Sequence, residues 1–290
     1  MRSLRELYRI GKGPSSSHTI GPERACRLFL SENPDADGFR AVLYGSLAKT
    51  GIGHGTDRVI RSVLKGAEIV CDTQKEDLPH PNTMDLIAFR GGRQTAFMRI
   101  YSVGGGAIRI EGRPEEKGKE VYPLGSFSEI RAYCEEHSLR LSDYVFETEG
   151  EEIRTYLAEV WQAMRAAISA GLKAEGILPG GLGVERKARV LYRQKHIDES
   201  AETRENRLVC AYAFAVSEQN AAAETIVTAP TCGASGVLPA VLRYAQERRG
   251  FKDGDILRAL AAGGLVGNLI KANASISGAE CGCQAEIGSA

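Results

Sequence analysis

This sequence of 290 residues lacks long apolar runs. No run reaches the ~20 apolar residues that a membrane-spanning helix needs. The first residues, Met1-Arg2-Ser3-Leu4-Arg5, also lack the apolar core of a secretion signal. We therefore expect a cytoplasmic protein with no membrane partner.

An excess of charge of one sign is missing as well, because Lys+Arg and Asp+Glu both number 37. A formal net charge of +0 gives no sequence-independent attraction to nucleic acid, so no nucleic-acid partner is expected. The 7 cysteines are odd in number. In a chain without a secretion signal they favour thiols or metal ligands over a disulfide framework.

The pattern of apolar residues changes near the middle of the chain. Strands are predicted over residues 39–47, 85–90 and 95–103, with a glycine turn at 91–93, a helix over 58–65, and a capping box at Ser126 that starts a helix ending near residue 137. After an acidic connector at 147–152, helices are predicted over 156–174, 205–223, 237–247 and 256–272, with a short strand at 189–192. The expected fold is an α+β N-terminal domain, residues 1–148, followed by a mainly α-helical domain, residues 149–290.

A run of hydroxyls and one histidine is the most informative motif. Gly13-Pro14-Ser15-Ser16-Ser17-His18-Thr19 stands just before Pro22, which opens a predicted helix over residues 23–30. Hydroxyls and backbone N–H groups before a helix can hold a carboxylate or phosphate. Helix capping is the simpler interpretation, but one cap needs one hydroxyl and this run has four.

The cysteines divide into two groups. Cys26, Cys71, Cys134 and Cys210 lie in predicted helices or at a strand end, where they are most simply small buried hydrophobic residues. In contrast, Cys232 lies in a glycine-rich turn that would leave its sulfur reachable, and Cys281 and Cys283 lie on another flexible loop. Three thiols without paired Cys-x-x-Cys units fit an iron–sulfur cluster better than structural zinc, although zinc, redox and packing roles remain open.

Several motifs together resemble the bacterial iron–sulfur L-serine dehydratases, also called L-serine ammonia-lyases. They are, in chain order, the hydroxyl run at 13–19, Gly45-Ser46-Leu47, Gly53-His54-Gly55-Thr56-Asp57, His80-Pro81-Asn82, Gly104-Gly105-Gly106, Pro230-Thr231-Cys232-Gly233, and residues 273–284. The resemblance spans nearly the whole chain. Family members continue beyond Ala290 into an alanine-rich helix, so this sequence resembles a member truncated at its C-terminus.

The resemblance implies a serine dehydratase β domain over 1–148 and an α domain over 149–290. It also implies a 4Fe-4S cluster with three cysteine ligands and one open iron, for which Cys232 and Cys283 are the firmer candidates and Cys281 the third. The implied reaction removes water from L-serine, giving pyruvate and ammonia in amino-acid catabolism or gluconeogenesis, without pyridoxal phosphate. The resemblance also implies a homodimer.

The implied chemistry assigns roles to the polar residues. A histidine suits the removal of the Cα proton near neutral pH, with His54 favoured as the base and His18 as a partner of the carboxylate or hydroxyl. The expected substrate-binding residues are Ser15, Ser16, Ser17, Thr19, Thr56, Asp57, Asn273 and Ser275. His80 is interpreted as structural, and lining the cleft is the alternative that its family motif leaves open.

Two alternatives remain at this stage. The N-terminal domain resembles the allosteric substrate-binding domain of some phosphoglycerate dehydrogenases, which would suit a non-catalytic module that senses a small hydroxy or amino acid. A related 4Fe-4S lyase acting on L-threonine or L-cysteine is the other alternative.

Overall fold

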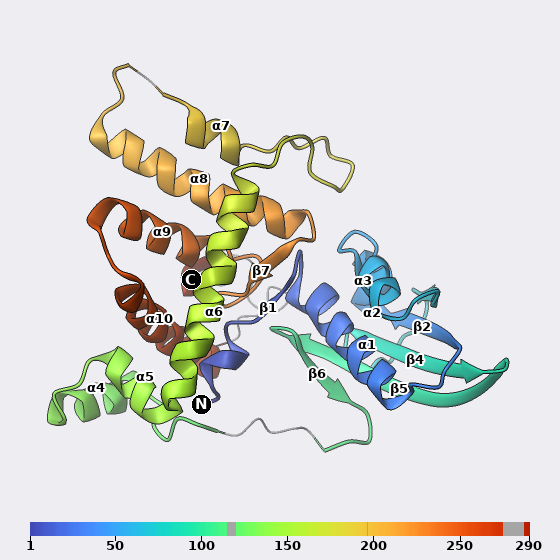
Figure 1. The fold of residues 1–290 in the computed structure, drawn as a ribbon. Helices are drawn as coiled ribbons and strands as arrows, with labels where there is room; N and C mark the ends of the chain where they lie inside the picture. Colours follow the sequence, from blue (N-terminus) through green and yellow to red (C-terminus); the bar gives the residue numbers. More distant parts are fainter. Residues whose placement is uncertain (115–119, 196, 275–286) are drawn as a thin grey trace. The chain divides into compact units, whose positions relative to one another are not determined.

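The computed structural model describes residues 1–114, 120–195, 197–274 and 287–290 (Figure 1). The chain forms two compact units. The sheet unit is Pro14–Lys117, and the helical unit combines Met1–Gly13 with Gly118–Ala290. An α+β N-terminal part followed by a mainly helical part confirms the predicted fold class.

The sheet unit contains one five-stranded sheet with the strand order β3-β2-β4-β5-β6. Strand β2 runs parallel to β3 and antiparallel to β4, and the remaining pairs are antiparallel. The elements of this unit are η2 (Ser16–Ile20), α1 (Gly21–Glu32), β2 (Gly38–Tyr44), α2 (Gly45–Thr50), α3 (Thr56–Val63), β3 (Glu68–Asp72), β4 (Thr83–Arg90), β5 (Arg93–Gly104) and β6 (Ala107–Ile110).

One face of this sheet carries the apolar core of the unit. Leu43, Leu86 and Ile100 occupy alternating positions on three adjacent strands, and each is fully buried. Phe29 of α1 and Ile60 of α3 belong to the same buried cluster, so these helices cover that face (Figure 1). This packing fixes the start of α1, and with it the hydroxyl run that precedes the helix.

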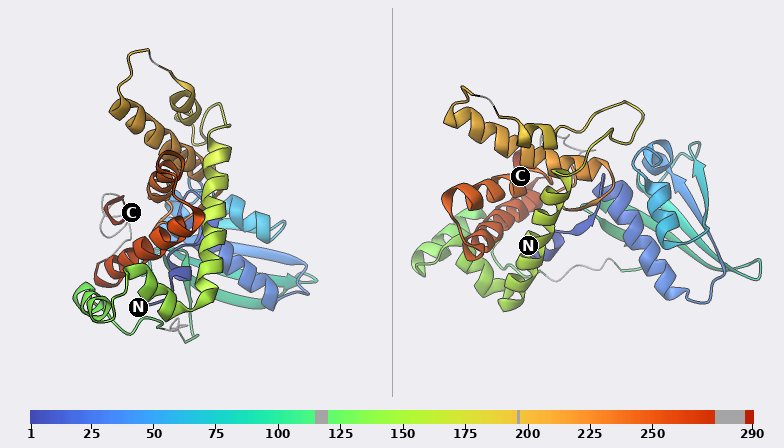
Figure 2. Two further views of the ribbon diagram at one scale, coloured as in Figure 1. Left: turned by 60° about the vertical axis from the view of Figure 1, so that its left-hand side comes forward. Right: turned by 45° about the horizontal axis from the view of Figure 1, so that its top comes forward.

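The helical unit is built around long helices, seen from two further directions in Figure 2. Trp161, at the middle of α6, is 1% exposed and belongs to the core of this unit. No helix within the described ranges is long and apolar enough to span a membrane. The elements are η1 (Leu4–Glu6), β1 (Ile10–Lys12), α4 (Phe127–Glu136), α5 (Leu141–Glu149), α6 (Glu151–Gly171), α7 (Ala188–Arg193), α8 (Ala201–Ala221), β7 (Thr225–Val227), α9 (Val237–Arg249) and α10 (Asp253–Asn273).

Three local predictions were wrong. The strand predicted over 39–47 ends at Tyr44, because Gly45 has a left-handed φ of 51° and begins α2. The strand predicted over 189–192 is part of α7, and the acidic connector predicted over 147–152 is helical except at Gly150. The capping box at Ser126 is confirmed at the start of α4. The boundary between the two domains, predicted at residue 148, falls within α5 and stays a prediction.

The contact between α6 and α8 gives a test of the packing. A Cβ atom added at Gly171 would lie 2.2 Å from the carbonyl oxygen of Ala215, which is backbone and cannot rotate away. We expect Gly171→Ala to lower the free energy of unfolding by about 1–3 kcal/mol, measured by chemical denaturation. Gly254→Ala is the matched control in α10, where an added Cβ meets nothing within 4 Å. It should change stability by no more than about 1 kcal/mol, in the stabilising direction, and an equal loss in both variants would contradict this account.

Candidate active site

The hydroxyl run folds into a single π-helical turn, η2, that leads directly into α1. Ser15 caps this turn, because its hydroxyl accepts a hydrogen bond from the backbone N–H of His18 at 3.2 Å. The Ser17 hydroxyl lies 3.0 Å from His18 Nδ1. The predicted cap is therefore present, and the same turn also orients a histidine.

Both ring nitrogens of His18 have hydrogen-bond partners. Besides Ser17 at Nδ1, its Nε2 lies 3.0 Å from the Ser46 hydroxyl and 3.1 Å from the Thr50 hydroxyl, both on α2. The side chain is buried, with the residue 9% exposed. Burial and the nearby His54 ring, whose centroid is 4.7 Å away, lower the pKa of His18 to about 4. His18 is therefore a neutral imidazole at neutral pH.

His54 lies in the loop between α2 and α3, with one ring nitrogen fixed and the other available. Its Nδ1 is 2.9 Å from the carbonyl oxygen of Thr50. A carbonyl only accepts, so Nδ1 carries the proton and Nε2 of the neutral ring has a lone pair. Within the described part of the chain, no hydrogen bond or ion pair involves His54 Nε2. This tautomer is the one that a general base requires.

Two threonine hydroxyls tie the histidine loops together. Thr19 donates to the carbonyl oxygen of His54 at 3.1 Å, and Thr56 donates to that of His18 at 2.6 Å. Both threonines are buried, so they act as braces between η2 and the His54 loop. In the part of the chain that the structure describes, the Ser16 hydroxyl has no hydrogen-bond partner, which leaves it available to a ligand.

Two hydroxyls from outside the run contact His18 and were not predicted as site residues. Ser46 was noted only as part of a motif, and Thr50 not at all, although they lie four residues apart on one face of α2. Ser102 of β5 was also missed. It donates to the carbonyl oxygen of Ser17 at 2.7 Å and its own carbonyl accepts from the Asn82 side-chain amide.

His80 and Asp57 occupy supporting positions. His80 Nδ1 accepts from the backbone N–H of Asn82 at 3.0 Å, and its carbonyl accepts from Thr83, which supports the structural interpretation of this histidine. Asp57 pairs with Arg61 at 3.3 Å through Oδ2. Its Oδ1 is buried and has no hydrogen-bond partner among the described residues.

The low pKa of His18 predicts a pH dependence of stability. Between pH 6.5 and about 4 the unfolded chain binds a proton at His18 that the folded chain does not, so the free energy of unfolding falls as pH falls through this window. We expect this residue alone to contribute a loss of about 3 kcal/mol. Chemical denaturation at several pH values should show that His18→Gln has a shallower dependence than wild type. His137→Gln, at an exposed site, should leave the dependence unchanged; equal slopes in all three proteins would contradict the assignment.

In the helical unit, Cys232 lies in the turn between β7 and α9. Contrary to expectation, its side chain is not reachable, since the residue is 1% exposed. The turn is closed by a hydrogen bond from the Ser235 backbone N–H to the Cys232 carbonyl oxygen at 3.2 Å. The Ser235 hydroxyl is itself buried and has no hydrogen-bond partner among the described residues. A buried hydroxyl left unpaired costs about 1–3 kcal/mol, and a water or a bound group that accepts from it would remove that cost.

The other cysteine predictions are partly confirmed. Cys26 and Cys134 are buried, and burial raises the pKa of both thiols, as expected for small packed residues. Cys71 and Cys210 are exposed, so the prediction of burial was wrong for them. In Cys210 the error arises because α8 turns that side chain away from its packed face.

Part of the predicted site lies outside the described residues, namely Ser275, Cys281 and Cys283. Asn273 is described; its side-chain amide donates to the Leu269 carbonyl oxygen at 2.8 Å at the end of α10. Among the residues that are described, no three His, Cys, Asp or Glu side chains gather as a metal site. The turn thus offers one buried thiol, at Cys232, and one buried unpaired hydroxyl three residues later, at Ser235, which suits one corner of a thiolate-held cluster.

Comparison with known proteins gives a consistent result. A family model described as serine dehydratase beta chain matches residues 3–69, and one described as serine dehydratase alpha chain matches residues 64–290. The L-serine dehydratase of Streptomyces coelicolor is 36% identical, aligned over 99% of this chain and 76% of its own length. L-serine dehydratase 1 of Escherichia coli is also 36% identical and that of Haemophilus influenzae 35%, with the same coverage.

Proposed function

Because the chain belongs to the serine dehydratase family, we propose that it is an L-serine ammonia-lyase. The reaction removes the Cα proton and the hydroxyl of L-serine, giving aminoacrylate, which hydrolyses to pyruvate and ammonia. The observation that carries this proposal is the pair of histidines in the sheet unit, one neutral and enclosed by hydroxyls, the other with an available Nε2. Pyruvate would enter amino-acid catabolism or gluconeogenesis.

His54 is the proposed base. Its Nδ1–H is held by the Thr50 carbonyl, so Nε2 accepts the Cα proton. A proton on His54 would be strongly opposed by a second positive charge at a ring centroid distance of 4.7 Å. His18 avoids this cost because its pKa of about 4 keeps it neutral at neutral pH.

The hydroxyl run is proposed to hold the substrate carboxylate. Ser15, Ser17 and Thr19 are engaged in shaping the turn, which leaves the Ser16 hydroxyl as the direct donor. Thr56 acts as a brace for His18. Asp57 is proposed to orient the His54 loop or to receive the substrate ammonium group; its Oδ2 already pairs with Arg61, and its buried Oδ1 is the oxygen without a partner among the described residues.

A 4Fe-4S cluster is the proposed cofactor, and pyridoxal phosphate is not required. Cys232, Cys283 and Cys281 would hold it, and the buried Ser235 hydroxyl in the same turn as Cys232 is proposed to donate to it. Asn273 and Ser275 are proposed to bind the substrate near this cluster. When bound, the cluster supplies Lewis acidity at its open iron, which makes hydroxide a better leaving group.

The experiment that tests the function is a product assay after anaerobic incubation of the protein with iron and sulfide. L-serine should yield pyruvate and ammonia in equal amounts. Sulfide release from L-cysteine, or ketobutyrate from L-threonine at a higher kcat/KM, would instead identify a related lyase. Binding of L-serine without any product would identify a sensing module and contradict the proposal.

A further inference from the structure

A hollow of about 660 Å³ opens between α7, α8 and α9, within the helical unit. We call it the cationic pocket and define it by Arg193, Lys195, Arg204 and Arg248, together with the rings of Tyr192 and Tyr212. Its volume is within the range of small-molecule sites, ~300–1,000 Å³. Neither the proposed reaction nor the motifs of the sequence use any of these residues.

A buried ion pair forms part of the lining of the pocket. Arg207 makes two contacts with the Glu199 carboxylate, at 2.6 and 2.7 Å, and a third with the Leu191 carbonyl oxygen at 2.7 Å. The side chains of Arg207 and Glu199 are only 10% and 6% exposed. These contacts tie α8 to the end of α7, so the backbone that carries Arg193 and Arg204 is held in place before any ligand arrives.

Both carboxylates that line the pocket already have hydrogen-bond or ion-pair partners. Glu199 is paired with Arg207, while Glu247 accepts from the Tyr212 hydroxyl and pairs with Arg243. These two carboxylates therefore do little to neutralise the other positive charges around the pocket.

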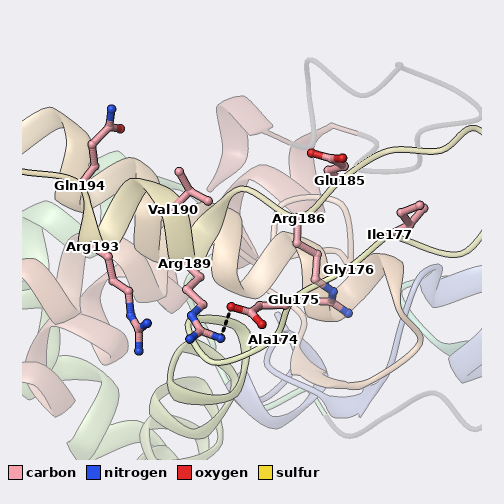
Figure 3. Close-up of a pocket in the computed structure, with 10 residues that line it drawn as sticks. All are labelled: Ala174, Glu175, Gly176, Ile177, Glu185, Arg186, Arg189, Val190, Arg193 and Gln194. Atoms are coloured by element: carbon pink, nitrogen blue, oxygen red, sulfur yellow. Dashed lines mark ion pairs between the residues drawn. The ribbon is translucent and has the colours of Figure 1, made fainter.

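The four cations at the opening have no such partners. In the described part of the chain, none of Arg193, Lys195, Arg204 and Arg248 forms an ion pair or a side-chain hydrogen bond, and all four are exposed. Figure 3 illustrates the contrast on α7, where Arg189 is paired with Glu175, whereas Arg193, one turn further, has no ion pair with any described residue. Three separate elements thus bring unpaired positive charge to one hollow in a chain of net charge +0.

We propose that the cationic pocket binds a small soluble molecule that carries two or more phosphate groups. Arginine forms paired hydrogen bonds with phosphate oxygens, and several cations around one concavity favour a polyanion over a single charge. Tyr192 is 42% exposed and its ring centroid lies 5.9 Å from that of Tyr212, so a flat organic group has an aromatic surface beside the phosphates. Inorganic polyphosphate and nucleoside polyphosphates share this chemistry.

Isothermal titration calorimetry at low ionic strength tests the proposal, with inorganic triphosphate, ATP and orthophosphate as the probes. Triphosphate should bind at one site per chain, and orthophosphate at least about tenfold more weakly. Tighter binding of ATP than of triphosphate would assign the aromatic surface to a base. Tighter binding of triphosphate would assign the pocket to phosphate groups alone.

Charge-neutralising variants locate the site. Arg204→Gln and Arg248→Gln should each weaken triphosphate binding by about tenfold, because each removes a charge-assisted contact. Arg249→Gln is the matched control, since Arg249 is exposed, ends the same helix and does not line the pocket. The Arg249→Gln variant makes the same change in net charge and should have little effect on triphosphate binding. An equal loss in all three variants would show diffuse attraction and overturn the proposal, as would equal affinity for orthophosphate and triphosphate.

Discussion

Replacing His54 by Asn is expected to lower kcat for pyruvate formation from L-serine by about 10²–10⁴-fold. The physical reason is the loss of the nitrogen that accepts the Cα proton, since Asn presents no basic lone pair there. The His54 side chain takes no part in the apolar core of the sheet unit, so folding should be unaffected. The visible absorbance of the reconstituted cluster should also be retained, which separates this loss from a failure to bind iron.

His137→Asn is the matched control for that variant. His137 makes the same local contact, with Nδ1 2.9 Å from the Tyr133 carbonyl oxygen, but it lies at the end of α4 in the helical unit. Its replacement should leave kcat unchanged. Near-normal turnover in His54→Asn would place the base elsewhere, with His18 the next candidate.

Replacing Cys232 by Ser is expected to abolish iron binding at the site and to reduce turnover to that of metal-free protein. A serine hydroxyl at this buried position remains protonated near neutral pH and is a poor ligand for an iron–sulfur cluster. Iron and acid-labile sulfide content, measured beside the rate of pyruvate formation, should fall together.

Cys210→Ser controls for the loss of a thiol as such, because Cys210 is exposed on α8. This variant should keep both its iron content and its rate. Retention of the cluster in Cys232→Ser, with normal turnover, would exclude Cys232 as a ligand.

Much of the fold could be predicted from the sequence because apolar periodicity and caps are local signals. The capping box at Ser126 and the helices α6, α8, α9 and α10 are examples. The segment 189–192 was assigned to a strand because its β-branched and aromatic residues favour strands when read alone. In the structure, packing of α7 on α8 overrides that local preference.

The candidate site was predictable only in part, for a different reason. The hydroxyl run and both histidines are recognisable by residue type, and the structure places them together in one unit. The contacts of Ser46 and Thr50 with His18 depend on where β2 ends, which is set by Gly45 and its close approach to the Pro81 carbonyl oxygen. The burial of Cys232 likewise follows from the packing of the turn before α9 and not from its glycine content.

The most direct test of the central claim compares pyruvate formation from L-serine by one preparation in three states: metal-free, loaded with zinc alone, and reconstituted without air with iron and sulfide. We expect turnover in the iron- and sulfide-loaded protein only. Equal turnover in the zinc-loaded or metal-free protein would contradict the proposed iron–sulfur chemistry and the role assigned to Cys232.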